Sequence, residues 1–518
     1  MRGYILWVDD EIDLLKPHIL YLEEKGYRVE KASNGRDAVS GIKKKVFDLV
    51  LLDEMMPGMD GIETLREIKE FRPEIPVIMI TKSEEEWLMD EAISEKIADY
   101  LTKPVNPSQI FLTCKRILEE EKILDEKAAS TYLKDFQEIE TTLSTDLSID
   151  DWWELYRKLV DWQLEMDKRK DLGLSTILEE QLKSTNKKFT QYIVNHYLDW
   201  IHSTQDDRPT LSVDVFQKYV RPHLHNGEKV FLLVIDCFRL DQAMTIFPNI
   251  QRYFTIETGF HLSILPSATP FSRNAIFSGR FLSDIQTREP ALWQSMVESE
   301  SSMNRYEPVL MEKLLKRLGC GETSFSYFKV NVAKEGKSFL SHLREYMDTS
   351  LITLVVNFVD LLTHHRSQSD VLQEMMLDES GYRSTVHTWF ENSWLFDVLK
   401  SLSQSSYKVV LTSDHGSIRV QKGVRVIADR ETSTGVRYKY GRNLNCPEKH
   451  AFVVKRPRDY FLPEMMTGTN YLMAKEDIYF VYPTQYRKYI NLYQNSFQHG
   501  GISMDEMIVP TITLSGKR

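Results

Sequence analysis

The C-terminal part of the chain carries aspartates and histidines whose types and spacing could hold metal ions. Asp236 and Asp414 each follow an apolar run, and His415 follows Asp414 directly. The full set has three aspartates and three histidines: Asp236, Asp360, His364, Asp414, His415 and His499. Zinc accepts imidazole nitrogen and carboxylate oxygen, so this set suits two zinc ions. Alone, Asp236 could cap a strand end and His499 could be an ordinary surface histidine; only the set favours metal.

A second group of acids lies near the N-terminus. Asp9 and Asp10 follow one apolar run, Asp53 follows another, and Thr81 and Lys103 follow two more. Three converging carboxylates repel one another, and Mg²⁺, which prefers carboxylate and phosphate oxygens, would relieve that repulsion. The alternative is that the first two acids cap a helix and that the lysine lies on the surface. Agreement of the separate elements in order and spacing favours the magnesium pocket.

Both groups need sheets that bring distant residues together. Short apolar runs, which are typical of buried parallel strands, alternate with amphipathic stretches at 5–8, 49–52, 77–80, 230–235, 352–358 and 409–413. This alternation predicts a doubly wound α/β fold at each end of the chain. Because open parallel sheets place ligands beyond the carboxyl ends of their strands, the candidate residues should meet there.

The middle of the chain shows no strand pattern and predicts a helical connector. Within it, Ser148 or Asp150 could cap a helix whose apolar residues recur at three- and four-residue spacing: Trp152, Leu155, Tyr156, Leu159 and Trp162. The sequence therefore predicts a multidomain α/β protein with a doubly wound domain at 1–118, the helical connector at 119–206 and a second α/β domain at 207–518.

Composition limits the class of protein. A chain of 518 residues with 42% hydrophobic and 27% charged residues can bury large cores in several domains. Subtracting 76 acidic from 65 basic side chains gives −11, which argues against a broad cationic surface for nucleic acid. The four cysteines form no C-x-x-C pair. With no secretion signal and no membrane-spanning run in the sequence, we expect a cytoplasmic protein without membrane insertion.

The N-terminal domain resembles the receiver domain of two-component response regulators. The resemblance lies in the run Asp53-Glu-Met-Met-Pro57-Gly-Met-Asp60-Gly61 and in the pair Lys103-Pro104. It implies that Asp53 accepts phosphate from a sensor histidine kinase, with Thr81 and Lys103 on the phosphoryl oxygens and Tyr100 at the aromatic switch position. It also implies magnesium ligands at Asp9, Asp10, Asp53 and the Met55 carbonyl. Lys82 departs from the small residue usual after the threonine.

The C-terminal domain resembles the PglZ members of the alkaline phosphatase superfamily. The resemblance rests on an ordered series of motifs: Asp236, Thr269, Asp360-x-x-x-His364, Asp414-His415-Gly416 and His499. It implies one zinc ion held by Asp236, Thr269, Asp414 and His415, and a second held by Asp360, His364 and His499. It also implies that Thr269 is the nucleophile that attacks phosphorus.

The neighbours of Thr269 bear on the substrate. The sulfatase branch needs a modified Cys or Ser, whereas this run reads Thr269-Pro-Phe-Ser-Arg273, so a sulfatase is disfavoured. Ser272, Arg273 and Asn274 are candidate substrate contacts. Monoester and diester substrates are hard to separate from sequence, and we favour a phosphodiester.

The order of receiver, connector and PglZ-like domain resembles the PorX-type response regulators of the type IX secretion system. This implies that phosphorylation of Asp53 controls homodimerisation and a zinc-dependent phosphodiesterase that regulates secretion, with nucleotide or oligonucleotide substrates. We expect the face at about 83–118 to repack on phosphorylation. One alternative is a non-catalytic scaffold that binds secretion components or a sigma factor. A DNA-binding regulator is disfavoured, since the sequence contains no recognisable helix-turn-helix.

Overall fold

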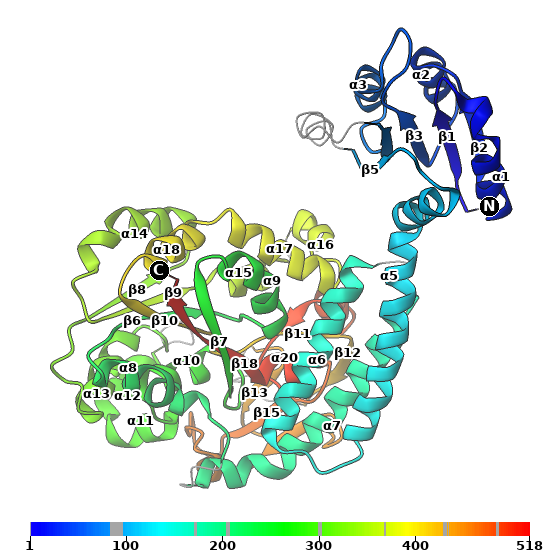
Figure 1. Cartoon of the computed structure of the whole chain (residues 1–518). Helices are drawn as coiled ribbons and strands as arrows, with labels where there is room; N and C mark the ends of the chain where they lie inside the picture. The colour runs from blue at the N-terminus through cyan, green and yellow to red at the C-terminus, as the bar shows by residue number, and fades with distance from the viewer. Residues whose placement is uncertain are drawn as a thin grey trace. The chain divides into compact units, whose positions relative to one another are not determined.

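The computed structural model of the chain describes residues 2–82, 97–169, 173–203, 208–298, 303–366, 369–427, 433, 435–482 and 486–517. The chain divides into two compact units, Met1–Asp135 and Phe136–Arg518, each of which is described by itself (Figure 1). The first part of the face expected to repack, 83–96, lies outside the described residues. No described helix is long and apolar enough to cross a membrane.

The first unit contains a five-stranded parallel sheet in the order β2-β1-β3-β4-β5. Its strands are β1 (Tyr4–Val8), β2 (Arg28–Ala32), β3 (Leu49–Asp53), β4 (Val77–Thr81) and β5 (Asp99–Thr102). Its helices are η1 (Ile12–Leu15), α1 (Lys16–Glu24), α2 (Gly35–Lys44), α3 (Gly61–Phe71) and the start of α5 (Pro107–Thr142). Side chains that alternate along β1 enter two separate hydrophobic clusters, because successive residues of a strand face opposite sides. The doubly wound fold predicted here is confirmed.

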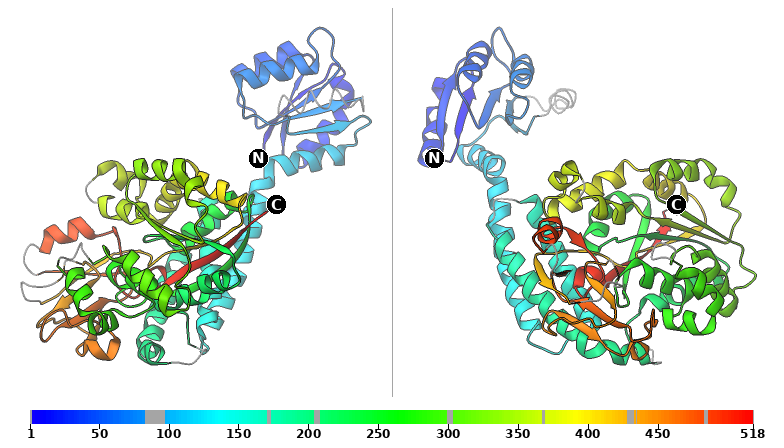
Figure 2. Two further views of the ribbon diagram at one scale, coloured as in Figure 1. Left: turned by 90° about the vertical axis from the view of Figure 1, so that its left-hand side faces the viewer. Right: turned by 180° about the vertical axis from the view of Figure 1, so that it is seen from behind.

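In the second unit, the end of α5 is followed by two long helices, α6 (Ile149–Lys168) and α7 (Ser175–His202), which lie side by side (Figures 1 and 2). Of the two predicted caps for α6, Ser148 is the N-cap: its hydroxyl accepts the Asp151 N–H, and the Asp151 carboxylate accepts the Ser148 N–H in return. The apolar face of α6 packs on α7, where the Trp152 and Phe189 rings lie 5.3 Å apart.

The core of the second unit is a six-stranded sheet in the order β7-β18-β10-β6-β9-β8. Its strands are β6 (Lys229–Ile235), β7 (Phe254–Leu262), β8 (Phe325–Val330), β9 (Leu351–Val356), β10 (Tyr407–Thr412) and β18 (Ile508–Gly516). Strands β10, β6, β9 and β8 are parallel, and β18 runs antiparallel to both β10 and β7. Consequently, the carboxyl ends of β10, β6 and β9 meet at one edge.

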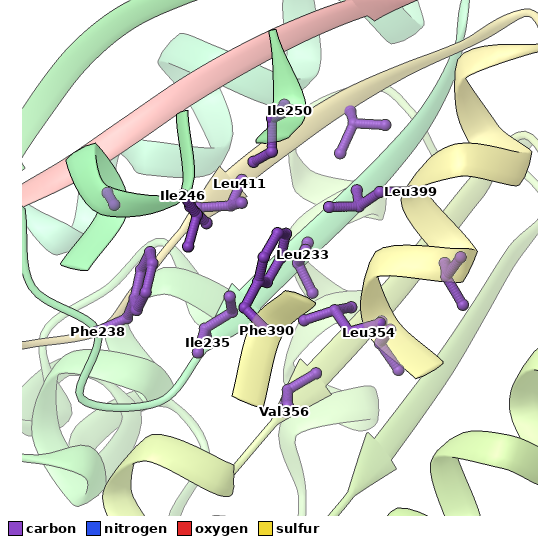
Figure 3. Close-up of a cluster of buried hydrophobic side chains, with 14 of the residues drawn as sticks. Leu233, Ile235, Phe238, Ile246, Ile250, Leu354, Val356, Phe390, Leu399 and Leu411 are labelled. Carbon is purple, nitrogen blue, oxygen red and sulfur yellow. The ribbon is translucent and has the colours of Figure 1, made fainter. Parts of the chain in front are cut away.

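Helices pack on one face of this sheet through a cluster of buried apolar side chains (Figure 3). The contributing helices are α9 (Leu240–Ile250), α17 (Glu379–Glu391) and α18 (Trp394–Ser403). Their side chains Ile246, Ile250, Phe390 and Leu399 meet Leu233, Ile235, Leu354, Val356 and Leu411 of the strands. All nine side chains are buried. Burial of apolar surface contributes about 25 cal/mol per Å² to stability, so this cluster stabilises the packing of the helices on the sheet.

The remaining elements surround this core. Three smaller sheets pair β11 (Ile418–Arg419) with β17 (Phe497–Gln498), β12 (Lys422–Arg425) with β16 (Ile478–Val481), and β15 (Asn470–Ala474) with β13 (Tyr438–Gly441) and β14 (Ala451–Val454). The other helices are η2 (Ser212–Asp214), η3 (Phe216–Val220), α8 (Arg221–His225), α10 (Thr269–Ser278), α11 (Leu282–Arg288), α12 (Pro290–Met296), α13 (Glu307–Arg317), α14 (Ala333–Tyr346), α15 (Phe358–Arg366), α16 (Asp370–Met375), η5 (Pro457–Tyr460), α19 (Tyr486–Tyr493) and α20 (Met504–Met507).

Candidate functional site

Sheet topology brings the predicted zinc ligands to one edge. Asp236 follows β6 and Asp414 lies two residues after β10, while Asp360 sits in the first turn of α15, just past β9. His364 lies one helical turn later on the same helix, and His499 follows β17 directly. These residues are far apart in sequence, and the parallel order β10-β6-β9 makes them neighbours in space.

The first cluster consists of Asp236, Asp414 and His415, whose ligand atoms all lie within 4.8 Å of one another. Thr269, the first residue of α10, faces it: its Oγ1 lies 3.3 Å from Asp236 Oδ1 and 3.0 Å from His415 Nε2. The other ring nitrogen, Nδ1, is 3.0 Å from the Gly416 carbonyl and must donate to it. In the neutral ring this leaves Nε2 with a lone pair that points at the hydroxyl.

A strained turn completes this cluster. Cys237 adopts φ of 64°, a left-handed value uncommon for a residue other than glycine. In that conformation its N–H lies 3.3 Å from Asp414 Oδ1 as a donor. The second oxygen of the same carboxylate, Oδ2, is buried and accepts no hydrogen bond from any described residue. A buried carboxylate oxygen without a donor is the kind of atom that a cation satisfies.

The second cluster consists of Asp360, His364 and His499, again with ligand atoms within 4.8 Å. Asp360 Oδ1 lies 3.3 Å from His364 Nε2 and 3.4 Å from His499 Nε2. Despite these distances, Asp360 Oδ1 has no hydrogen bond to a described residue, and neither has His499 Nδ1. Two imidazole nitrogens that converge on one buried carboxylate oxygen fit a shared metal ion. The adjacent His365 is exposed, and its Nδ1 contacts the Leu361 carbonyl at 2.8 Å, outside the cluster.

Charge in this site is poorly compensated within the chain. Burial, reinforced by Asp414 and Asp360, raises the pKa of Asp236 to about 7, although Arg273 opposes the shift. Burial lowers the pKa of His415 to about 4, so its ring is neutral at pH 7. Burial would also raise the pKa of Asp360, but the nearby imidazoles of His364 and His499 hold it well below its usual range. Acids packed this closely favour a bound cation.

Arg273, a predicted substrate contact, is a buried cation bonded to carboxylates of the site. Its side chain is 2% exposed; Nη1 donates to Asp236 Oδ2 at 2.5 Å and to Asn357 Oδ1 at 3.1 Å, and Nε donates to Glu307 Oε1 at 2.7 Å. Asn304 joins the group, with Nδ2 2.8 Å from Glu307 Oε1 and 3.2 Å from the Thr269 carbonyl. Sequence reasoning missed the glutamate and both asparagines, because no motif near Thr269 points to them.

Ser272 and Asn274, predicted as substrate contacts, are instead bonded within the chain in this structure. Both are 0% exposed. Ser272 Oγ is 2.8 Å from Ser263 Oγ, and Asn274 Nδ2 donates to the Pro270 and Met303 carbonyls. The physical reason is that α10 is buried on every side beyond its first turn, so its later residues have no access to a ligand.

The receiver pocket lies at the carboxyl ends of β1 and β3. Ligand atoms of Asp9, Asp10 and Asp53 lie within 4.8 Å of one another. Lys103 Nζ bridges two of them, at 2.9 Å from Asp53 Oδ1 and 3.1 Å from Asp9 Oδ2. Burial raises the pKa of Asp53 despite Lys103, and Asp9 and Asp10 add to the rise. Burial alone would lower the pKa of Lys103, but the contact with Asp53 raises it.

Other predicted receiver residues lie around this pocket. The Thr81 hydroxyl donates to Glu54 Oε2, a buried partner that sequence reasoning did not anticipate. Tyr100 is 41% exposed and the Met55 side chain 66% exposed. Gly61 packs against the backbone just after Asp53, where a Cβ would lie 2.5 Å from the Asp53 carbonyl oxygen; its N–H donates to the Glu54 carbonyl at 2.7 Å. A side chain at Gly61 would therefore displace the turn that follows the phosphoacceptor.

Three family models match successive parts of the chain. A response regulator receiver domain matches residues 5–115, and a PorX response regulator linker domain matches 122–201. A BREX system PglZ alkaline phosphatase-like domain matches 215–514, more than half of the chain. The chain is a PorX-type response regulator of the PglZ family. The predicted multidomain α/β fold class is confirmed by the same matches.

Several transcriptional regulators are similar to part of this PorX-type regulator. The chain is 39% identical to the transcriptional regulatory protein ResD of Bacillus subtilis over 114 residues. This match covers 22% of the chain and 47% of ResD. Over 127 residues the chain is 40% identical to the transcriptional regulatory protein ZraR of Klebsiella oxytoca, covering 24% of the chain and 29% of ZraR. The chain thus spans less than half of either relative.

A longer match is to the alkaline phosphatase synthesis transcriptional regulatory protein PhoP of Bacillus subtilis, 32% identical over 169 residues, which are 32% of the chain and 68% of PhoP. Among solved structures, chemotaxis protein CheY4 of Vibrio cholerae is 30% identical, covering 22% of the PorX-type regulator and 98% of CheY4 with a TM-score of 0.22.

Proposed function

We propose that this PorX-type regulator is a metal-dependent phosphodiesterase with Thr269 as nucleophile. The observation that carries the proposal is the position of the Thr269 hydroxyl, 3.3 Å from Asp236 and 3.0 Å from His415, at the edge of a cluster in which Asp414 Oδ2 has no hydrogen bond to a described residue. A structural zinc site closes its shell with protein ligands, whereas a catalytic site keeps a place for substrate. A hydroxyl at this place supports catalysis over a scaffold role.

The residues present fit two zinc ions, one held by Asp236, Thr269, Asp414 and His415 and the other by Asp360, His364 and His499. When bound, such ions lower the pKa of a hydroxyl or water and neutralise charge on phosphoryl oxygens.

The chain's own groups account for the remaining features of the reaction. Thr269 Oγ1 forms a bond to phosphorus while the bond from phosphorus to the leaving oxygen breaks, and water then hydrolyses the phosphothreonine. Helix α10 begins at Thr269, so the partial positive charge of its N-terminus faces the phosphoryl group. Arg273 holds the Asp236 carboxylate, and Asn304 holds the Thr269 carbonyl. These contacts fix the nucleophile before substrate arrives.

Hydrolysis of bis-p-nitrophenyl phosphate and p-nitrophenyl phosphate tests the proposal. We expect zinc-dependent turnover that chelation abolishes, with preference for the diester, followed by turnover of nucleotide or oligonucleotide diesters. Preference for the monoester would make the enzyme a phosphatase. No turnover of either ester by protein that holds two zinc ions would favour the scaffold that binds secretion components or a sigma factor.

The receiver is the proposed control element. A sensor histidine kinase would phosphorylate Asp53 in a magnesium pocket made by Asp9, Asp10, Asp53 and the Met55 carbonyl. The phosphoryl group adds about −1.5 to −2 charge, which attracts the Lys103 ammonium and the Thr81 hydroxyl, with Tyr100 following as the switch residue. In this proposal phosphorylation drives homodimerisation in the cytoplasm and thereby controls type IX secretion. Light scattering with and without a phosphoryl mimic tests dimerisation, and a mass that stays monomeric would refute it.

A further inference from the structure

Helix α7 of the linker contacts both loops that carry the catalytic groups. One is the nucleophile loop, residues 263–268, which leads from β7 into Thr269. The other is the histidine loop, residues 499–503, which leads from His499 into α20. Helix α7 packs against α20 directly, and α6, α7 and these loops belong to the same compact unit. The linker therefore has a structural route to the site.

The nucleophile loop is attached to α7 through Tyr197. The Leu265 N–H donates to the Tyr197 hydroxyl oxygen at 2.9 Å, and the tyrosine is 1% exposed. Leu265 lies four residues before the nucleophile, and the loop between them is buried throughout. A buried N–H that loses its acceptor costs about 1–3 kcal/mol, so the Tyr197 hydroxyl contributes to holding the loop in place.

The histidine loop is attached to the same helix through Asn186 and Thr190. The Met504 N–H donates to Asn186 Oδ1 at 2.9 Å, and the Thr190 hydroxyl donates to the Ile502 carbonyl at 3.3 Å. Asn186 is 7% exposed and Thr190 is 2% exposed. Thr190 lies about two helical turns from Tyr197 and Asn186 about three, all on α7, so this helix holds both loops at once.

The two loops are also connected to each other. Ser267 Oγ, two residues before Thr269, donates to the Gly501 carbonyl at 2.7 Å. The Gly501 N–H donates to Glu506 Oε1 at 2.8 Å, and the Glu506 carbonyl accepts the Gly416 N–H at 3.0 Å. Gly501 has no free space, since a Cβ there would lie 2.4 Å from the Ala474 carbonyl oxygen. Movement of α20 would therefore pass to His499 and to the segment that follows His415.

We propose that α7 is a positioning element of the catalytic site, in which Tyr197 sets the position of Thr269 and Asn186 sets the position of His499. The inference rests on the proposed function. It makes the linker more than a spacer, because any displacement of α7 relative to the sheet would alter nucleophile and metal ligand together. It also separates two effects, since Tyr197 acts on the nucleophilic hydroxyl, whose zinc would keep three other ligands, and Asn186 acts on a histidine ligand.

Two substitutions test the separation. Asn186→Ala should weaken binding of one of two zinc ions by about tenfold or more, measured by competition with a chromogenic chelator, because residues that orient a metal ligand change affinity by about 10–100-fold. Asn186→Asp keeps an accepting oxygen and should retain the zinc. Tyr197→Phe should keep both zinc ions and lower kcat for the diester by about 10–100-fold, with KM changed less than about twofold.

Tyr407→Phe is the matched control. Its hydroxyl also bonds to the backbone, here as the donor to the Thr349 carbonyl, but Tyr407 begins β10 at the edge opposite the site. It should change neither zinc affinity nor kcat. The proposal is overturned if Asn186→Ala binds both zinc ions as tightly as wild type, if Tyr197→Phe keeps full kcat, or if Tyr407→Phe shows the same losses. If wild type hydrolyses neither ester, the proposed function fails, and zinc affinity of the Asn186 variants alone decides the inference.

Discussion

Replacing Arg273 with methionine should destabilise the metal-free protein by about 3–5 kcal/mol, because removing one partner of a buried ion pair leaves an uncompensated charge. The guanidinium donates to Asp236 at 2.5 Å and to Glu307 at 2.7 Å, and all three side chains are at most 3% exposed. Methionine fills similar space without charge. Two buried carboxylates would then lose their main cationic partner, and the pKa of Asp236, already raised to about 7 by burial, would rise further.

Zinc should reduce this loss. A bound ion supplies positive charge at Asp236, so only Glu307 remains without its guanidinium, and we expect a loss of about 1–3 kcal/mol. The free energy of unfolding follows from urea titration monitored by tryptophan fluorescence, with chelator in one series and zinc in the other. Equal losses in both series, or a loss below about 1 kcal/mol without metal, would refute the assignment of Arg273 as the charge partner of a metal ligand.

Arg383→Met is the matched control for that experiment. Arg383 is also buried, and it donates to Asp167 at 2.7 Å and to Asp241 at 3.1 Å, neither of which is a predicted zinc ligand. Its replacement should cost about the same with and without zinc.

Three further predictions concern metal binding and the receiver. Because Asp236 with a pKa near 7 must release its proton to bind metal, apparent zinc affinity should fall about tenfold per pH unit below 7, measured by chelator competition from pH 5 to 8; a flat profile would contradict this. Lys103→Met removes the ammonium 2.9 Å from Asp53 and should slow phosphorylation by a small-molecule phosphodonor about tenfold or more, followed on phosphate-affinity gels; an unchanged rate would argue against the predicted role. Gly61→Ala places a Cβ 2.5 Å from the Asp53 carbonyl oxygen and should cost the receiver about 1–3 kcal/mol in urea unfolding, and a neutral effect would contradict the packing.

The central strands could be predicted from sequence because they are buried on both faces. The apolar run 230–235 predicted a strand, and the structure forms β6 at Lys229–Ile235. Every residue from Val230 to Ile235 is 0% exposed. The run at 352–358 predicted a longer strand than exists: β9 is Leu351–Val356, and Phe358 begins α15. Apolar content continues across this boundary, so sequence could not separate the strand from the helix that carries Asp360.

Strands with one exposed face escaped prediction. β2 (Arg28–Ala32) lies at the sheet edge and carries polar residues, and β7 (Phe254–Leu262) is largely half-exposed. In both, pairing with a neighbouring strand decides the conformation, and the local apolar pattern is weak.

Some residues of the site could be predicted from sequence and others could not. Residues that end strands or open helices, such as Asp236 and Thr269, could be located because topology dictates where strand ends meet. Glu307, by contrast, reaches the site through its contacts with Arg273 and Asn304, and these depend on how α13 packs on α10. Ser272 lies close to the nucleophile in sequence, but the helix turns it into the core. Side-chain direction on a short buried helix follows from packing that sequence does not display.

The most direct test of the account is the turnover of bis-p-nitrophenyl phosphate by zinc-loaded Thr269→Val, with zinc content measured on the same sample. Thr245→Val serves as control, since its hydroxyl donates to the Gln242 carbonyl within α9. The account predicts a loss of at least about a thousandfold in kcat for the Thr269 variant and none for the control. Turnover close to wild type in Thr269→Val with zinc bound would contradict the assignment of the nucleophile.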